Sequence, residues 1–243
     1  MTETNPKLAT IKALLAKAED PAASPAEAEA YFAKAASLMA KHGIEQAMLS
    51  EAEPGTDTLD SQEFKIEGTY VPDRATLLFA ISHALGAQNI FWNLTNWNTG
   101  KRYRLVRIYA HASTLARIDV LFTSLQLQAL NGVQYGRPQP GESTTAYRKS
   151  WLSGFSSAVR KRLQLAEESA AQEANEGGAT GAELVLVKRE QAVLAYFKGQ
   201  HPGVKHAPKR RLTGAGWKDG VKAGASADLG GSHLGGRTRE SLT

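Results

Sequence analysis

The stretch that constrains the fold most is TAYRKSWLSGFSSAVRKRL at residues 145–163. Its large apolar residues are Tyr147, Trp151, Phe155, Val159 and Leu163. On a helical wheel that advances 100° per residue, these side chains lie within about 80° of Phe155. The pattern predicts a long helix over residues 145–174 that buries this face in a core.

The other side of the same helix is basic and carries small hydroxyl residues. Lys149, Ser153, Ser156 and Arg160 lie between about 100° and 160° from Phe155 on the wheel. Serine lets a backbone approach closely, and Lys and Arg supply positive charge, so such a face suits contacts with phosphates. An ordinary solvated surface is the alternative.

Arg148 and Arg162 flank Phe155 symmetrically and lie within about 20° of the buried face. A charge in that position must extend to solvent, pair with a buried acid, or hold an anion. The two arginines are roughly 21 Å apart along the helix axis, so they cannot share one small ligand. Structural pairing and an anion clamp are both open at each arginine.

The N-terminal part of the chain indicates two helices joined by a turn. Apolar residues recur at helical spacing over residues 8–18. Ser24 then caps a second helix, Pro25 suits its first position, and Glu27 completes a capping box. Gly43 is expected to end this helix in a left-handed conformation.

The remainder alternates between strand and helix patterns. After a short third helix at 45–52 and a polar linker at 53–61, strands are expected near 64–66, 89–94 and 102–109, the last two around a turn at 96–100. Further helices are expected over 73–85, with Asp73 as the cap, and from Ser113 to 130. The apolar run Leu184–Val187 is either a buried strand or the start of a helix.

These elements predict an α+β fold that is mostly helical. It combines an N-terminal helical hairpin with a larger mixed domain that contains a short β-hairpin or a small antiparallel sheet. The expected division is a hairpin domain at 1–52, a linker at 53–62, the mixed domain at 63–198, and a basic, glycine-rich tail at 199–243, where order becomes doubtful.

Charge is distributed unevenly along the chain. The whole sequence carries a formal net charge of +5 at pH 7 and has a pI of about 9.3. Residues 1–62 carry −5 and the remainder +10. An acidic head on a basic body favours two modules with different partners, or a head that folds onto the body. Solvated surface charge is the alternative.

The tail resembles a flexible basic arm, which binds phosphates without reading the sequence. Gly216, Gly220 and Gly224 recur every four residues, so this segment is either a flexible linker or a helix with a smooth face for close packing. The residues expected to contact nucleic acid are Lys149, Arg160, Lys161, Lys205, Lys209, Arg210, Arg211, Lys218 and Lys222.

Aromatic and basic residues interleave on the expected β-hairpin. They are Trp92, Trp97, Tyr103 and Tyr109 together with Lys101, Arg102, Arg104 and Arg107. Such a surface stacks bases and neutralises the backbone of a single-stranded nucleic acid. The alternative is that the aromatic residues belong to the core of a short sheet.

The N-terminal stretch resembles a known family. The likeness is carried by residues 11–18, 28–30 and 38–44, the last of which reads LMAKHGI. These residues resemble the family catalogued as domain of unknown function 2786, which occurs in bacterial and bacteriophage proteins. Segments 147–155, 160–163, 182–187 and 223–230 resemble the second domain that commonly follows it. The resemblance implies an architecture, and the family has no established catalytic residues to carry over.

Several classes of protein are excluded or disfavoured. A chain without cysteine has no disulfide framework, thiolate zinc site or cysteine nucleophile. The longest apolar runs are far below 18 residues and the N-terminus lacks a secretory signal, so a cytoplasmic protein is expected. Motifs for ATP hydrolysis, dinucleotide binding and α/β-hydrolase chemistry are absent, and Asp60, Glu63 and Lys65 match a metal-nuclease pattern poorly. No metal or other cofactor is expected.

Three functions remain open at this point. The leading hypothesis is a non-catalytic nucleic-acid-binding protein that acts mainly through phosphate contacts. The second is a bacterial or bacteriophage adaptor that binds a protein partner through residues 1–50. The third is a metal-dependent hydrolase whose carboxylates the sequence does not identify. No membrane partner is expected.

Overall fold

The computed structural model describes residues 10, 13–14, 17, 25–176, 181–205, 207–208 and 210–227. Over this part of the chain the fold is α+β and mostly helical, with a small antiparallel sheet, as predicted. The helices are α2 (Pro25–Ala52), α3 (Val71–Ala84), α4 (Ala112–Gly132), η1 (Val133–Tyr135), α5 (Thr144–Glu176), α6 (Ala182–Gln200) and α7 (Trp217–Ser226). None of the helices in the described part is long and apolar enough to span a membrane.

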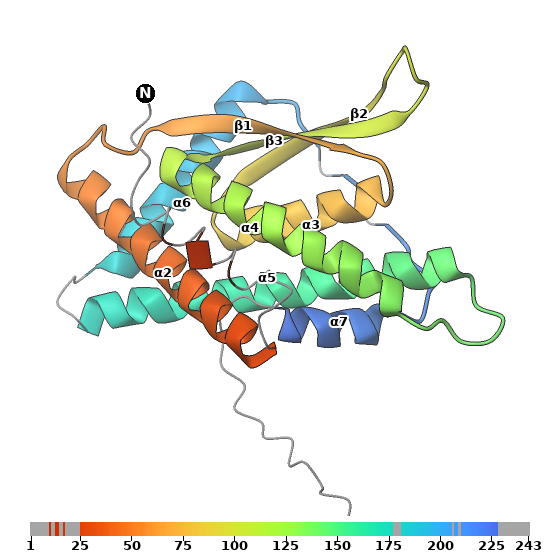
Figure 1. The fold of residues 1–243 in the computed structure, drawn as a ribbon. Helices are drawn as coiled ribbons and strands as arrows, with labels where there is room; N and C mark the ends of the chain where they lie inside the picture. Colours follow the sequence, from red (N-terminus) through yellow and green to blue (C-terminus); the bar gives the residue numbers. More distant parts are fainter. Residues whose placement is uncertain are drawn as a thin grey trace, which may run out of the picture.

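The sheet consists of β1 (Leu59–Glu67), β2 (Gln88–Thr95) and β3 (Arg102–His111), in the order β1-β3-β2 with both pairs antiparallel. β2 and β3 form the predicted hairpin, and its closed end projects beyond the helices (Figure 1). In the register, Phe64 of β1 and Phe91 of β2 both lie opposite Val106 of β3. Because alternate side chains share a face, these residues define the buried face of the sheet.

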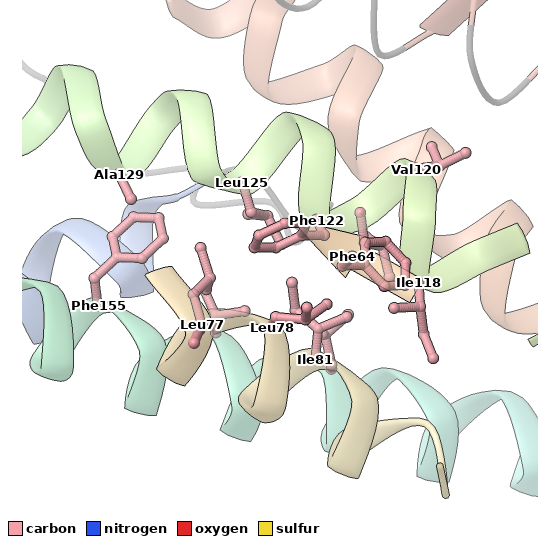
Figure 2. Close-up of a cluster of buried hydrophobic side chains, with 14 of the residues drawn as sticks. Phe64, Leu77, Leu78, Ile81, Ile118, Val120, Phe122, Leu125, Ala129 and Phe155 are labelled. Atoms are coloured by element: carbon pink, nitrogen blue, oxygen red, sulfur yellow. The ribbon is translucent and has the colours of Figure 1, made fainter. Parts of the chain in front are cut away.

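The main core lies between this face of the sheet and α3, α4 and α5. α3 contributes Leu77, Leu78 and Ile81, which are fully buried. Phe122 of α4 meets the ring of Phe64 edge-on at a centroid distance of 5.9 Å. Figure 2 shows these side chains pointing into one space between the helices. α3 and α4 correspond to the helices predicted over 73–85 and from Ser113 to 130.

The apolar face predicted for α5 is also confirmed, since Tyr147, Trp151, Phe155, Val159 and Leu163 are all buried. The rings of Trp151 and Phe155 stack at 5.5 Å between centroids. Part of this face is covered by α7, which lies along α5 in Figure 1. The hydroxyl of Tyr147 donates to Asp219 of α7 at 2.6 Å, and burial together with this carboxylate raises the pKa of Tyr147 to about 12.

Glycines allow α7 to pack backbone to backbone against α5. A Cβ at Gly216 or Gly224 would lie 2.5 or 2.6 Å from a carbonyl oxygen of α5, and one at Gly220 would overlap the carbonyl oxygen of Trp151. The smooth helical face is thus the correct alternative for this segment. This helix lies in the tail beyond Gly199, where the sequence left order in doubt, and these contacts hold it against the core.

The predicted helix end at Gly43 is wrong, because α2 continues through it to Ala52 and includes the residues expected as a separate third helix. Gly43 is needed for a close approach rather than for a left-handed turn. A Cβ at this position would lie 2.7 Å from Cζ of the buried Arg117 of α4. The predicted turn and most of the first predicted helix lie outside the described residues. Of that helix the structure describes Thr10, Ala13, Leu14 and Lys17, which are helical.

Two other local expectations also differ from the structure. α3 begins at Val71, so Asp73 does not cap it, and its carboxylate is buried in the first turn. β1 begins at Leu59, within the stretch expected as linker, and the preceding Asp57 is buried against Ser113 at the start of α4. The run Leu184–Val187 belongs to α6.

Candidate nucleic-acid interface

The closed end of the β2–β3 hairpin is an ordered turn that carries an exposed tryptophan. The side chain of Asn96 accepts hydrogen bonds from the backbone of Asn98 and Thr99 at 3.0 and 3.2 Å. Gly100 adopts a left-handed conformation with φ of 66°. Trp97, between these residues, is 95% exposed. An indole held in solvent by an ordered turn has a large apolar surface available for stacking.

A hollow of about 360 Å³ lies beside Trp97 on the outer face of the sheet. It is lined by Lys65, Leu94, Thr95, Asn96, Trp97, Asn98 and Tyr103. The ammonium of Lys65 lies 5.1 Å from the ring centroid of Tyr103 and 2.8 Å from the carboxylate of Glu67, which raises the pKa of Lys65. Two aromatic rings and a lysine thus line one depression.

A larger hollow of about 810 Å³ adjoins the first, because Leu94, Thr95 and Tyr103 line both. It extends from the hairpin to the first turns of α3 and α5, with Tyr70 and Thr145 in its wall. Its cationic residues are Arg102 and Lys149. We call the two hollows and the residues that line them the hairpin groove.

Positive charge gathers in the wall of this groove around one buried carboxylate, since Asp73 and Lys149 both line the larger hollow. The side chain of Asp73 is 1% exposed, and Nη2 of Arg210 lies 2.9 Å from its Oδ1. Burial raises the pKa of Asp73, while Arg210 and Lys149 lower it by Coulombic attraction. Arg104 is the third cation nearby, and burial and Arg210 lower its pKa. Three cations around one anion leave the region positive.

Arg104 is fixed in this position by its neighbours. Its guanidinium lies 4.2 Å from the ring centroid of Phe91, and its Nε donates to the side chain of Asn93 at 2.9 Å. Asn93 also lines the larger hollow. Part of the positive potential of the groove is thus held rigidly by the sheet itself.

The structure brings two of the sequence-predicted residues, Lys149 and Arg210, together at Asp73. Arg160 lies on the same side of α5 as Lys149, roughly 16 Å along the axis. α7, with the exposed Lys218 and Lys222, packs on the opposite side of α5. The other predicted contacts, Lys161, Lys205 and Arg211, are also exposed, and Lys209 lies outside the described residues.

The two arginines predicted near the buried face of α5 have different surroundings. Nη1 of Arg162 donates to the carbonyl oxygen of Gly224 at 3.2 Å, so this arginine contacts the C-terminal part of α7. Arg148 is half-buried, and its Nε has no hydrogen-bond partner among the described residues.

The interleaved aromatic residues divide between surface and core. Trp97 and Tyr103 line the hairpin groove. Trp92 is half-buried with the guanidinium of Arg107 5.6 Å from its ring centroid. Tyr109 is buried under α6, where its hydroxyl is 2.6 Å from Nε2 of His201.

Sequence reasoning did not group Lys65, Tyr70 and Asp73 with the hairpin. Lys65 and Tyr103 meet because β1 pairs with β3, a pairing that no short sequence pattern specifies. Asp73 was taken as a helix cap because an acid before an apolar helical stripe is the usual sign of one. The Val-Pro before it was an available signal, since Pro favours the first helical turn and so moves the helix start upstream.

Residues 7–46 match the model of a family described as Protein of unknown function (DUF2786). This similarity agrees with the resemblance inferred from LMAKHGI and the residues before it. No curated protein and no solved structure matches the chain. The match covers the N-terminal segment and Gly43 of α2, and the hairpin groove lies outside it.

Proposed function

We propose that this chain is a non-catalytic nucleic-acid-binding protein that holds a single strand in the hairpin groove, mainly through phosphate contacts. The observation that carries the proposal is Trp97, which is almost fully exposed on an ordered turn beside Tyr103 and Lys65. Exposed aromatic rings next to cationic side chains are the means by which proteins bind unpaired bases without reading sequence.

Electrostatics support an anionic partner in the same place. Arg102 and Lys149 line the larger hollow together with Asp73. Arg104 and Arg210 lie nearby, so the cations outnumber this one carboxylate. A strand that stacks a base near Trp97 then has phosphates within reach of several cations. Because the cations neutralise phosphates and release counterions, binding should weaken steeply as salt rises.

Fluorescence anisotropy with labelled single-stranded DNA, single-stranded RNA and duplex DNA, each at several salt concentrations, tests the proposal. We expect the full chain to prefer single strands. Trp97→Ala should weaken binding roughly 5- to 150-fold, since stacking contributes about 1–3 kcal/mol per base. Lys149→Glu should weaken it further at low salt and reduce the slope of log affinity against log salt.

Matched controls come from the same chain. Tyr135→Ala removes an aromatic side chain that is 85% exposed but lies outside both hollows. Lys198→Glu makes the same charge change as Lys149→Glu at a distant place on the surface. Lys198 is exposed and follows Phe197, whose ring contacts Tyr109, and Tyr109 lies roughly 20 Å along β3 from Tyr103. Equal losses in the test and control variants would contradict a site at the hairpin, and no binding at low salt would contradict the function.

Location and source follow from this proposal and the family likeness. A nucleic-acid partner implies a cytoplasmic protein, and similarity to the DUF2786 family implies a bacterial or bacteriophage source.

The basic arm contributes through Lys205 and Arg211. Charge reversal at Lys205 and Arg211 tests this contribution more cleanly than removal of the chain beyond Gly199. That removal would also delete α7, which covers Tyr147 and Trp151.

A second candidate is the adaptor that binds a protein through α2. A groove of about 590 Å³ between α2 and α5, lined by Ile44, Met48 and Ala174 among others, favours it. Leu49 at its edge is 43% exposed. Because α2 packs against α5 and α6, the test is Leu49→Glu in the full chain: loss of a partner retained by the parent protein would support the adaptor.

A further inference from the structure

The outer face of the sheet is the side away from α3, α4 and α5, and it continues from the hollow beside Trp97 towards α6 (Figure 1). It is formed by alternate residues of the three strands: Ser61, Glu63, Lys65 and Glu67 of β1; Gln88, Ile90, Trp92 and Leu94 of β2; and Tyr103, Leu105, Arg107 and Tyr109 of β3. α6 covers the end of this face at Tyr109, whose ring meets that of Phe197 at 5.5 Å between centroids. Between Tyr109 and Trp97 the face keeps solvent contact through partly exposed side chains.

Three aromatic rings follow one another along this face. Trp97 and Tyr103 line the same hollow. Trp92 pairs with Leu105 in the register, and Tyr103 precedes Leu105 by two residues on the same face of β3. Such diagonal neighbours are about 7–8 Å apart, so Tyr103 and Trp92 are adjacent on the face. A sheet with aromatic side chains at adjacent positions stacks two or three successive bases of a single strand.

The charges on this face balance. The ammonium of Lys65, beside the first of the strand rings, lies 2.8 Å from the carboxylate of Glu67. Arg107 pairs with Glu63 in the same way, and its guanidinium lies 5.6 Å from the ring centroid of Trp92. Two paired cations and two acids leave the face without net charge, so it suits bases better than phosphates.

The excess cations of the hairpin lie on its other face. Arg102 and Arg104 alternate with the outward residues of β3, and Arg102 lines the larger hollow together with Lys149. β2 is at one edge of the sheet. A nucleic-acid strand that runs along β2 therefore meets aromatic rings on one side and cations on the other. This arrangement matches the strand itself, which has bases on one side and phosphates on the other.

We infer that the partner of this protein is an unpaired stretch of at least three nucleotides, whose bases stack on Trp97, Tyr103 and Trp92 and whose phosphates lie along β2. The inference rests on the proposed function, and it extends the hairpin groove by one base site formed by Trp92 and Arg107. Bases within a duplex are stacked on one another, so their faces are not available to these rings.

Photochemical cross-linking of the parent protein tests the three base sites directly. The probes are single strands of about ten thymidines or uridines, within the usual range of site sizes, in which one base is replaced by 5-iodouracil. This base cross-links to aromatic side chains on which it stacks, and mass spectrometry identifies the modified residue. We expect products at Trp97, Tyr103 and Trp92, and the higher yield of the DNA or the RNA probe identifies the preferred sugar.

A variant tests the contribution of the third ring to affinity. Trp92→Leu removes this ring and keeps an apolar side chain in the half-buried position, and it should weaken binding of the same strands at least about fivefold in anisotropy. Trp217→Leu is the matched control and should leave the affinity unchanged. Trp217 is 47% exposed on α7, which packs against α5 on the far side from the sheet (Figure 1).

The outcomes separate this inference from the proposed function. Cross-links at Trp97 and Tyr103 without one at Trp92 would overturn the third base site and leave the function standing. Unchanged affinity of a folded Trp92→Leu, or equal losses in Trp92→Leu and Trp217→Leu, would do the same. Absence of binding by the parent protein at low salt would contradict both. If urea denaturation shows that Trp92→Leu does not fold, cross-linking of the parent protein decides.

Discussion

The hairpin groove and the junction around Arg117 use the same residue types in opposite ways. At the groove, Trp97, Arg102 and Lys149 line an open surface, and cations outnumber the one buried anion. At the junction, Arg117 and Arg189 each have a carboxylate partner and are shielded from water. The open groove therefore suits the proposed anionic partner, whereas the buried ion pairs of the junction contribute to stability.

The largest difference between the two regions should appear when one partner of an ion pair is removed. Glu167→Ala leaves Arg117 charged and buried, and we expect a loss of about 3–5 kcal/mol in the free energy of unfolding. Glu63→Ala removes the partner of Arg107 on the exposed sheet face and should cost at most about 1 kcal/mol. Urea denaturation of both variants measures the contrast, and similar losses would mean that burial does not distinguish the two pairs.

A smaller loss is expected where α7 packs on α5. In Gly220→Ala the new methyl group overlaps the carbonyl oxygen of Trp151, and neither backbone yields easily. We expect a loss of about 1–3 kcal/mol, measured by urea denaturation. Gly203→Ala is the matched control, because its Cβ meets no atom within 4 Å, and should change stability by less than about 0.5 kcal/mol. A neutral Gly220→Ala would mean that α7 is not held closely to α5.

The junction should also respond to pH through His111. Burial holds its folded-state pKa below the ordinary value of 6.5, so the unfolded chain takes up this proton first. Stability should therefore fall as pH drops from 6.5 to the folded-state pKa. Asp57 does not contribute there, since its own pKa is lowered from 3.8. The free energy of unfolding of the parent protein and of His111→Asn is measured at pH 7.5 and 5.5. The parent should lose more stability between these pH values than the variant, by an amount smaller than either loss above. Equal losses in the two proteins would show that His111 titrates normally.

Local patterns predicted the elements of this fold well, and long-range contacts explain where they failed. The apolar stripe of α5 and the turn between β2 and β3 depend on neighbours in sequence. The role of Gly43 was predicted wrongly because this glycine leaves room for the guanidinium of Arg117. Arg117 is 74 residues away in sequence and contacts Gly43 only in the folded chain. Asp57 was assigned to a linker because its partners, Ser113 and Arg189, lie 56 and 132 residues away in sequence.

The candidate sites were only partly predictable for the same reason. Trp97 and Tyr103 were recognised because they lie on one hairpin, and Lys149 because it lies on one helix. Lys65 and Tyr70 were not, since they come from β1 and from the start of α3 and carry no motif that joins them to the hairpin. Their place beside the hairpin depends on strand pairing and helix packing, which a local pattern does not specify.

The smallest effect on stability, and the one that best separates the two regions, is expected at Trp97. The side chain is 95% exposed, so Trp97→Ala removes little buried area and should change the free energy of unfolding by less than about 0.5 kcal/mol. The same variant should lose affinity for single strands, because the indole is the proposed stacking surface. Urea denaturation and anisotropy on one preparation measure both. A large loss of stability would mean that Trp97 serves the fold, and the groove would then lose its principal feature as a binding site.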